Sequence, residues 1–585
     1  MNKTTDAAFR ETVARHGDRP FLCVPSDPAR GYHQDGYEID YANAAGAVDE
    51  LIARYRDAGY GHGHRVAVAL ENRPEHCLHK LALNALGISC VPINPDYRPA
   101  EIAYLLDHCE ADLILHLDSN ADSLRAAMSE ISRDVPMIEA SKFADGPPAA
   151  KRPAPIAGPV TPQSEASLLY TSGTTGRPKG CILSHQYELM SGAWYADLGG
   201  LMALEPGAER VYNPLPLYHV NSGILSFFGM LLTGGCQIQP DRFHPRSWWR
   251  QVCETEATLV HYLGVVAPML LNQPPNDLER AHSVRVGFGA GVEPGLHVLF
   301  EERFGFPLVE VWGMTEMVRV LADNHEPRQR GSHAMGRPQV GLEVRVVDDN
   351  DQEVPPDTVG EMTLRYSEET PRFGAFSGYL KDDPATEEAW RGGWLHTGDS
   401  VRQAADGMLY FVDRKKHIIR RSGENIAAAE VEATLQAHDG VAQVAVLATP
   451  DGTREEEVFA CVVAVNESDR TETFARELFD LCFERLAYFK APGWLTFVDD
   501  LPKTGSQKIQ KHRIFGADGD PRDAAGFRIG VGAQHDLAHG VERVELIVGA
   551  HDVAALALVK GAGADIGVLA GEGCSHVIYG ELAGG

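Results

Sequence analysis

The stretch SLLYTSGTTGRPKG, residues 167–180, decides how the rest of the chain is interpreted. Its first four residues form a short apolar run typical of a buried strand. The three glycines that follow permit unusual backbone angles, so several backbone N–H groups can point inward together, and the Ser and Thr hydroxyls add donors. Lys179 adds a positive charge. These features favour a loop that binds polyphosphate over a merely flexible loop. The loop is not a Walker A motif, because the sixth position counted from Gly173 is Pro178.

Upstream of this loop, the chain alternates between strand-like and helix-like segments. Five segments follow one another in the order strand, helix, strand, helix, strand: RVAVAL (65–70), PEHCLHKLALNALG (74–87), CVPIN (90–94), PAEIAYLLDHCEA (99–111) and DLILHL (112–117). This alternation predicts a parallel sheet covered by helices. A Pro- and Ala-rich connection at 145–162 then leads to a second α/β block, expected from residue 166 to about residue 321.

The pattern changes in the C-terminal half. Short β-like runs between residues 335 and 411 predict a small antiparallel or barrel-like subdomain. The most basic stretch, RKKHIIRRSGEN (414–425), precedes two helical and two strand-like segments of a separate α+β unit. We therefore predict an α/β fold with a large N-terminal domain at 1–413, built from parallel α/β sheets and the small β subdomain. An α+β C-terminal domain follows at 414–515, and then a Gly- and Ala-rich tail of unknown role at 516–585. The tail is expected to alternate strand, helix and strand.

Composition limits the possible functions. A chain of 585 residues exceeds the roughly 250–300 residues of a single core, so several domains are expected. The formal charge of −29 repels phosphate backbones and argues against general nucleic-acid binding. The ten cysteines form no C-x-x-C pair, which favours reduced thiols in a cytoplasmic protein. The apolar run GILSFFGMLLTGG (223–235) is shorter than the roughly 20 residues that span a bilayer, so it predicts a buried helix and no membrane span.

Further motifs follow the loop in a fixed order: GAG (289–291), VWGMTE (311–316), WLHTGD (394–399), DRKK (413–416), SGEN (422–425) and LPKTGSQKI (501–509). Together with the loop they resemble the signature of the adenylate-forming superfamily, which includes acyl-CoA synthetases, amino-acid adenylation domains and beetle luciferases. The resemblance runs from about residue 40 to residue 511. It implies an enzyme of two steps: ATP and a carboxylate give an acyl-adenylate and pyrophosphate, and the thiol of coenzyme A then displaces AMP. It also implies Mg²⁺ as a cofactor.

The resemblance assigns most motifs to the nucleotide. It implies that Trp312 offers a flat face to adenine, Thr315 contacts the α-phosphate, Glu316 binds Mg²⁺, and Asp399 and Arg414 contact the ribose. Two departures are Trp312, where the family usually has Tyr, and Gln507, where it usually has Gly. The full expected set is Thr171, Ser172, Gly173, Thr174, Thr175, Gly176, Lys179, Gly289, Ala290, Gly291, Trp312, Gly313, Met314, Thr315, Asp399, Arg414 and Lys508. Simpler interpretations remain open: WGMTE as a helix start capped by Thr, and Asp399 as a local cap.

The C-terminal motifs are implied to act in turn. Lys508 is expected to stabilise charge during adenylation, acting with Thr315, Glu316 and His219 as the catalytic set. Rotation about a hinge near Lys416 would then bring a coenzyme A site into place. That site is expected at Arg420, Arg421, Ser422 and Gly423, because an acidic protein needs a local cationic patch for this polyanion. A surface charge or nuclear-localisation role for the two arginines is the alternative.

The acid substrate is the least determined part. His219 lies in PLYHVNS (216–222), where the family places its acyl gate, although a lone His is often structural. This segment contains no Asp that could bind the α-ammonium group of an amino acid, which disfavours an amino-acid substrate. Residues 215–292 most resemble crotonobetaine/carnitine–CoA ligases, which would place a quaternary nitrogen against aromatic faces such as Tyr218, Phe227 and Phe228. Arg319 meeting a second carboxylate is the competing interpretation.

Two rival functions stay open beside the ligase: transfer of the adenylate to another acceptor such as a carrier protein, and a non-catalytic nucleotide-binding scaffold. The expected partners are ATP, coenzyme A and a small carboxylate, without nucleic acid, and a homodimer is left open.

Overall fold

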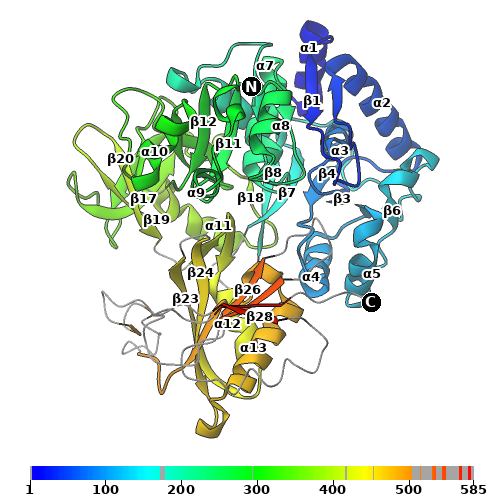
Figure 1. The fold of residues 1–585 in the computed structure, drawn as a ribbon. Helices are drawn as coiled ribbons and strands as arrows, with labels where there is room; N and C mark the ends of the chain where they lie inside the picture. Colours follow the sequence, from blue (N-terminus) through cyan, green and yellow to red (C-terminus); the bar gives the residue numbers. More distant parts are fainter. Residues whose placement is uncertain are drawn as a thin grey trace. The chain divides into compact units, whose positions relative to one another are not determined.

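The computed structural model describes residues 3–171, 178–292, 294–414, 418–451, 454–502, 511 and 514–515, together with four short strands of the tail. The described residues divide into two compact units, with the division between Lys416 and His417. Figure 1 traces the chain from blue to red. The large unit holds three sheets, and the small unit follows it in sequence.

A seven-stranded sheet carries the glycine-rich loop. Its strand order is β18-β8-β7-β4-β3-β5-β6, and its strands are β3 (Arg65–Ala69), β4 (Ser89–Pro92), β5 (Leu113–His116), β6 (Met137–Glu139), β7 (Glu165–Thr171), β8 (Lys179–Ser184) and β18 (Gly378–Tyr379). The strands from β7 to β6 pair in parallel, and the helices α3 (Pro74–Ala85), α4 (Pro99–Cys109) and α5 (Ala121–Ser129) lie between them in the chain. The predicted parallel α/β block is confirmed, with antiparallel strands β8 and β18 at one edge.

An eight-stranded sheet has the order β14-β13-β12-β11-β9-β10-β1-β2. It differs from the expected block that starts at residue 166, because β7 and β8 pair in the seven-stranded sheet and β1 and β2 come from the N-terminal residues. Its strands are β1 (Pro20–Val24), β2 (Tyr37–Asp40), β9 (Arg210–Tyr212), β10 (Cys236–Ile238), β11 (Leu259–Leu263), β12 (Val286–Ala290), β13 (Leu308–Met314) and β14 (Met317–Ala322). Its core is parallel, and β2 and β14 pair antiparallel at the two edges.

The helices of this part are α1 (Thr5–His16), α2 (Tyr41–Asp57), α6 (His185–Ala196), α7 (Phe227–Thr233), α8 (Trp248–Glu254), α9 (Val266–Leu271) and α10 (Pro294–Phe304). A π-helix at Asn221–Ser226 continues into α7, and this pair is the predicted buried helix. None of the described helices is long and apolar enough to cross a membrane.

The third sheet confirms the small β subdomain. It is antiparallel, in the order β15-β20-β19-β17-β16. Its strands are β15 (Ala334–Gly336), β16 (Glu343–Val347), β17 (Val359–Arg365), β19 (Leu395–Gln403) and β20 (Leu409–Arg414), with α11 (Asp383–Ala389) between β17 and β19.

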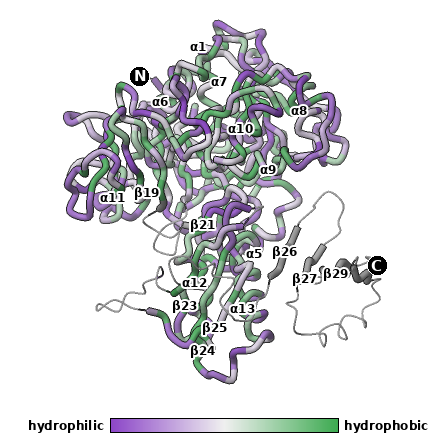
Figure 2. Tube along the Cα trace, turned by 60° about the vertical axis from the view of Figure 1, so that its left-hand side comes forward, coloured by the Kyte–Doolittle hydropathy of each residue, from purple (hydrophilic) through white to green (hydrophobic). Residues whose placement is uncertain are grey.

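The small unit is an α+β unit, as its sequence pattern predicts. Its strands are β21 (Ile418–Arg421), β22 (Glu424–Ala427), β23 (Val441–Asp451), β24 (Glu455–Ala464) and β25 (Trp494–Phe497), and its helices are α12 (Ala428–Gln436) and α13 (Glu472–Arg485). Figure 2 shows hydrophobic residues along β23 and β24, which pair over their full length. The middle of β23, Val444 to Leu447, is buried on both faces, and the exposed residues of the strand lie toward its two ends.

The tail differs from its prediction. Its strands are β26 (Gly530–Gln534), β27 (Arg543–Ile547), β28 (Ile566–Leu569) and β29 (Val577–Gly580). They form one sheet in the order β26-β27-β29-β28, and every pairing is antiparallel. Three strands occur where runs of apolar residues predict them, but they do not form the parallel arrangement that a strand–helix–strand pattern implies. The helix expected at 552–564 lies outside the described residues.

Candidate functional site

The two strands that flank the glycine-rich loop are paired with each other. Thr171, the last residue of β7, lies opposite Lys179, the first residue of β8. The residues between Thr171 and Pro178, including Ser172, Gly173, Thr174, Thr175 and Gly176, lie outside the described residues. The ammonium of Lys179 lies 4.8 Å from the centre of the Tyr379 ring. A regular antiparallel ladder therefore fixes both ends of the loop.

Glu316 lies in a tight turn beside that lysine. Met314 pairs with Met317, so Thr315 and Glu316 form the turn of the β13–β14 hairpin, and the interpretation of WGMTE as a helix start is wrong. The Tyr379 hydroxyl donates to Glu316 Oε1 at 2.7 Å, and Glu316 is only 8 % exposed. Tyr379 thus contacts both Lys179, through its ring, and Glu316, through its hydroxyl.

Sequence reasoning missed Tyr379. Its strand β18 is two residues long and pairs with β8, which places Tyr379 opposite Cys181. The hydroxyl–carboxylate contact joins residues 63 positions apart. Burial, and then the charge of the nearby Glu316, raises the pKa of Tyr379, so its hydroxyl remains a donor. The only local signal was an aromatic residue directly after glycine in SGY.

The residues expected at adenine and ribose are joined directly. The indole N–H of Trp312 donates to Asp399 Oδ2 at 2.8 Å, and the two side chains are 4 % and 3 % exposed. The backbone of Asp399 lies opposite Arg414 in the β19–β20 ladder. Gly398, just before Asp399, has φ of +72° and donates its N–H to Glu361 at 3.0 Å. Gly398 thus forms part of an irregularity in the β17–β19 pairing, directly before Asp399.

The GAG segment is hydrogen-bonded through its backbone to the buried carboxylate of Glu310. Gly289 lies against the backbone of Tyr262, where an added Cβ would come within 2.2 Å of the carbonyl oxygen. Gly291 has φ of +86° and donates its N–H to Glu310 at 2.9 Å, while the Tyr262 hydroxyl donates to the other Glu310 oxygen at 2.7 Å. Burial raises the pKa of Glu310 to about 7, against the lowering effect of these hydrogen bonds. Ala290 therefore sits in a constrained backbone segment.

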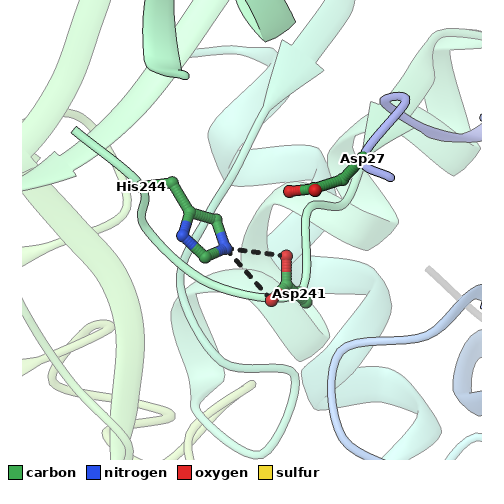
Figure 3. Close-up of side chains that lie close together, drawn as sticks. All are labelled: Asp27, Asp241 and His244. Carbon is green, nitrogen blue, oxygen red and sulfur yellow. Dashed lines mark hydrogen bonds and ion pairs between the residues drawn. The ribbon is translucent and has the colours of Figure 1, made fainter. Parts of the chain in front are cut away.

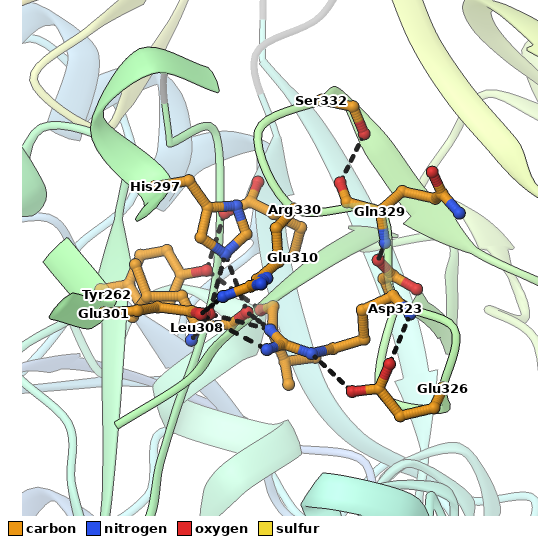
Figure 4. Close-up of polar contacts among 12 residues, drawn as sticks. Tyr262, His297, Glu301, Leu308, Glu310, Asp323, Glu326, Gln329, Arg330 and Ser332 are labelled. Atoms are coloured by element: carbon orange, nitrogen blue, oxygen red, sulfur yellow. Dashed lines mark hydrogen bonds and ion pairs between the residues drawn. The ribbon is translucent and has the colours of Figure 1, made fainter. Parts of the chain in front are cut away.

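A second carboxylate supports the same region, as Figure 4 shows. Glu301 accepts from the Leu308 backbone N–H at 2.9 Å and pairs with His297 and Arg328 at 3.2 and 2.8 Å. Burial disfavours its charged form, but the hydrogen bonds from His297 and Arg328 outweigh burial and bring its pKa to about 2. The network ties α10 to the start of β13, the strand that leads to Trp312.

His219 lies in the turn before the π-helix. Its backbone N–H donates to Pro216, and its ring lies 4.7 Å from that of Tyr218. Sequence reasoning missed the polar cluster that follows: Asn213, Asn221, Ser226, His261 and Tyr195 are joined by hydrogen bonds. Burial lowers the pKa of His261 to about 3, so this ring is neutral. Phe227 and Phe228 are fully buried core residues.

The residues expected at coenzyme A form a hairpin in the small unit. Ser422 and Gly423 have φ of +51° and +88° and connect β21 to β22, as in a two-residue hairpin turn that favours glycine. Arg421 is buried and pairs with Glu457 at 2.8 Å, and it also donates to the Phe489 carbonyl. Arg420 lies beside it in β21, and its backbone N–H donates to Glu456. Arg421 thus has structural partners of its own.

Several other expectations fall outside the described residues. Lys508, Gln507 and the hinge residue Lys416 are not described, and the side chain of Arg414 is not described either. The nine cysteines among the described residues are all unpaired, as predicted for reduced thiols.

One further cluster in the described part of the chain has the spacing of a metal site: Asp27, Asp241 and His244 (Figure 3). His244 Nε2 donates to both oxygens of Asp241 at 3.0 and 3.1 Å, and Asp27 accepts from the Ala29 backbone at 3.0 Å. These hydrogen bonds account for the cluster without an ion.

Comparison with known proteins agrees with this arrangement. Residues 9–380 match the sequence profile of the AMP-binding enzyme family, and residues 430–508 match that of the AMP-binding enzyme C-terminal domain. The chain is an AMP-binding enzyme. The predicted membership of the adenylate-forming superfamily is confirmed.

Curated relatives of this AMP-binding enzyme include two CoA ligases. It is 30 % identical over 516 residues to the sulfoacetate–CoA ligase of Cupriavidus necator, which covers 87 % of this chain and 97 % of the relative. It is 27 % identical to the crotonobetaine/carnitine–CoA ligase of Proteus mirabilis, over 82 % of this chain and 93 % of the relative. These relatives confirm the prediction of an ATP-dependent, AMP-forming acid–CoA ligase. They also confirm the predicted resemblance to crotonobetaine/carnitine–CoA ligases.

Solved structures confirm the fold of this AMP-binding enzyme. The o-succinylbenzoate CoA synthetase of Bacillus subtilis aligns with a TM-score of 0.74 and 24 % identity over 87 % of this chain and 98 % of that chain. The amide bond synthetase of Marinactinospora thermotolerans aligns with a TM-score of 0.72 and 25 % identity over 86 % of this chain and 98 % of that chain.

Proposed function

We propose that this AMP-binding enzyme activates a small carboxylic acid in the large unit and transfers it to coenzyme A. The observation that carries the proposal is the convergence of separate motifs: Trp312 is bonded to Asp399, and Tyr379 joins Lys179 to Glu316. In this assignment Asp399 accepts from the ribose hydroxyls, and Thr171 and Lys179 contact the phosphates. Trp312 acts both as an adenine wall and as a donor that orients Asp399.

The donor set suits a magnesium ion bound with ATP. Glu316 offers a carboxylate, the hard oxygen ligand that Mg²⁺ prefers, while the Thr315 hydroxyl is assigned to the α-phosphate. The bound ion would neutralise phosphate charge. Tyr379 would then hold the Glu316 carboxylate by the hydrogen bond that it already makes.

We further propose that the two halves of the reaction use the small unit differently. Residues 1–413 would bind ATP and the acid, and residues 414–515, hinged near Lys416, would supply Lys508 for adenylation. The Arg420–Gly423 hairpin would then serve the thiol step. Arg420, Arg421, Ser422 and Gly423 are assigned to coenzyme A, and the ion pair with Glu457 holds Arg421 in place within the hairpin. The unpaired thiols and the intracellular substrates favour the cytoplasm.

The relatives' names suggest two acid classes. One is an acid with a second anionic group, as in sulfoacetate, and the other is an acid with a quaternary nitrogen, as in crotonobetaine or carnitine. His219 is assigned to the acyl site in both cases. The burial of Phe227 and Phe228 removes two of the three aromatic faces considered for a quaternary nitrogen.

Pyrophosphate release from ATP, measured with the full chain over a panel of small acids, tests the function. We expect release to depend on one class of acid, and AMP release to accelerate when coenzyme A is added. No release with any acid would contradict the ligase function. Release that coenzyme A does not accelerate would instead favour another acceptor.

A further inference from the structure

Arg319 is a buried cation on the strand that leads away from Glu316. It lies three residues after Glu316 on β14 and is 3 % exposed. Its guanidinium contacts two thioether sulfurs, Met317 Sδ at 3.6 Å and Met190 Sδ at 3.9 Å, and lies 4.6 Å from the Tyr366 ring centre. In the described part of the chain, no carboxylate forms an ion pair with it.

The other fully buried cationic side chains of the described residues all have oxygen partners. Lys80 pairs with Glu188, Arg421 with Glu457 and Lys490 with Glu430, at 2.6, 2.8 and 2.9 Å. Arg30 donates to backbone carbonyl oxygens within 3 Å, those of Pro25, Tyr32 and His33. Arg319 alone among these five residues has only sulfur atoms and an aromatic face.

This environment does not compensate the charge. Removing a cation from water costs several kcal/mol, sulfur is a weak acceptor, and a desolvated cation–π contact returns about 2 kcal/mol. Burial lowers the pKa of Arg319 to about 10, so it is still protonated at neutral pH. A buried, protonated guanidinium that lacks an oxygen acceptor is suited to bind an anionic group of a ligand.

The position of Arg319 fits the far end of the acid. Gly374 lies against the guanidinium, where an added Cβ would come within 2.8 Å of Nη2. Two residues later, the Phe376 N–H donates to the Glu316 carbonyl at 3.0 Å. The same segment therefore borders both Arg319 and the turn assigned to the reacting end. Three residues of extended strand span roughly 10 Å, which a short acid and the arginine side chain can bridge together.

We propose that Arg319 binds a second anionic group of the acid substrate, so that the preferred acid is a small dianion ending in a carboxylate or sulfonate. This inference rests on the ligase function proposed above and names its substrate class. A quaternary nitrogen is disfavoured at the same place, because a buried cation repels it.

The test compares matched acids with the full-length wild type and Arg319→Met, which keeps length but removes charge. Succinate and malonate are paired with butyrate and propionate, with sulfoacetate and crotonobetaine alongside. In the wild type we expect kcat/KM for at least one dianion to exceed that of its monoanionic partner by about 100-fold. Arg319→Met should lose that advantage while the KM for ATP changes less than about threefold, and Arg319→Lys should recover part of it. The sulfonate and dicarboxylate arms show which group is preferred.

Arg402→Met is the matched control, since Arg402 also lies over a tyrosine ring, at 4.2 Å from Tyr410, but pairs with the exposed Asp357. It should retain the dianion preference. Calorimetric binding of the dianion to wild type and Arg319→Met needs no turnover, so it separates this inference from a failure of the ligase function. Equal binding by the two proteins, a preference for butyrate or crotonobetaine, or an equal loss for all acids in folded Arg319→Met would overturn the proposal.

Discussion

At the scale of single residues, Asp399 is the position in the proposed nucleotide site where we expect a substitution to weaken ATP binding most clearly. An ionised carboxylate can accept from both ribose hydroxyls at once, and Trp312 already holds one of its oxygens in place. Asp399→Ala should therefore weaken ATP binding at least about tenfold, because charge-assisted hydrogen bonds contribute roughly 1.5–3 kcal/mol each. The affinity for the acid should change much less. Separate titrations of the folded variant with nucleotide and with the acid measure the two affinities.

The control for Asp399 is Asp357→Ala, which removes an exposed carboxylate in the same subdomain. Trp312→Phe keeps an aromatic face but removes the indole N–H, so it should weaken ATP binding by a smaller factor. If Asp399 only caps the turn after Gly398, its variant would lose thermal stability and keep its nucleotide affinity.

Glu310 should make the stability of the large unit depend on pH. Its pKa is raised from 4.5 to about 7. The folded state thus holds this proton more tightly than the unfolded state, and the stabilisation is complete below pH 4.5 and is lost as pH rises through 7. Relative to Glu310→Gln, the wild type should lose roughly 3 kcal/mol between these pH values. Urea unfolding of the large unit at several pH values measures this difference in unfolding free energy between wild type and Glu310→Gln.

The same substitution at Glu368, whose side chain is 86 % exposed, should leave the pH profile unchanged. A parallel profile for wild type and Glu310→Gln would show that Glu310 is charged throughout and that its burial is compensated.

At the scale of elements, a buried ion pair holds two helices to the strand that carries the loop. Lys80 of α3 and Glu188 of α6 lie 2.6 Å apart, and both bond to Ser167 of β7. Lys80→Met should cost about 3–5 kcal/mol in unfolding free energy, because it leaves the fully buried Glu188 unpaired. Chemical denaturation measures the loss. The double variant Lys80→Met with Glu188→Leu should recover most of the lost unfolding free energy. If the single and the double variant were equally stable, the ion pair would not have this stabilising role.

The elements that the sequence predicts best are those with local causes. The strand RVAVA and the helix after it are set by apolar runs and by a proline at the first helical turn. The arrangement of the site depends instead on contacts between distant residues. Trp312 and Asp399 are 87 positions apart, and Tyr379 and Glu316 are 63 apart. The motifs predicted that Trp312, Asp399 and Glu316 share a site, but they did not predict Tyr379, and no motif predicts either hydrogen bond.

The alternative interpretation of WGMTE and the prediction for the tail are wrong for the same reason. WGMTE has residues suited to a helix start, yet the pairing of β13 with β14 makes it a hairpin turn. The tail has apolar runs that predict strands, but their partners, and hence the antiparallel order, are set by long-range pairing. The sequence places Arg319 shortly after Glu316, and only the structure shows that its guanidinium contacts sulfur atoms rather than oxygen.

At the scale of the whole molecule, the tail should be dispensable for ligase turnover. Its four described strands pair only with one another, in a sheet separate from that of β21 to β25. Truncation after residue 515 should leave pyrophosphate release and CoA-dependent AMP release within a few-fold of the full chain. A soluble, folded truncation with a large loss of either activity would show that the tail contributes to the site.

The proposed order of the two half-reactions predicts that Lys508 of the small unit acts in only one of them. If Lys508 acts only while the acyl-adenylate forms, Lys508→Ala should slow adenylation by about 10²–10³, the typical cost of losing one preorganised charge contact. It should spare the reaction of coenzyme A with a pre-formed acyl-adenylate. Lys511→Ala is the control, because Lys511 is engaged with Glu432 at 2.6 Å within the small unit; its folded variant should keep both rates. Single-turnover measurements of each half-reaction decide the matter. Equal slowing of both by Lys508→Ala would mean that the lysine serves one fixed site, and alternation about Lys416 would then have no support.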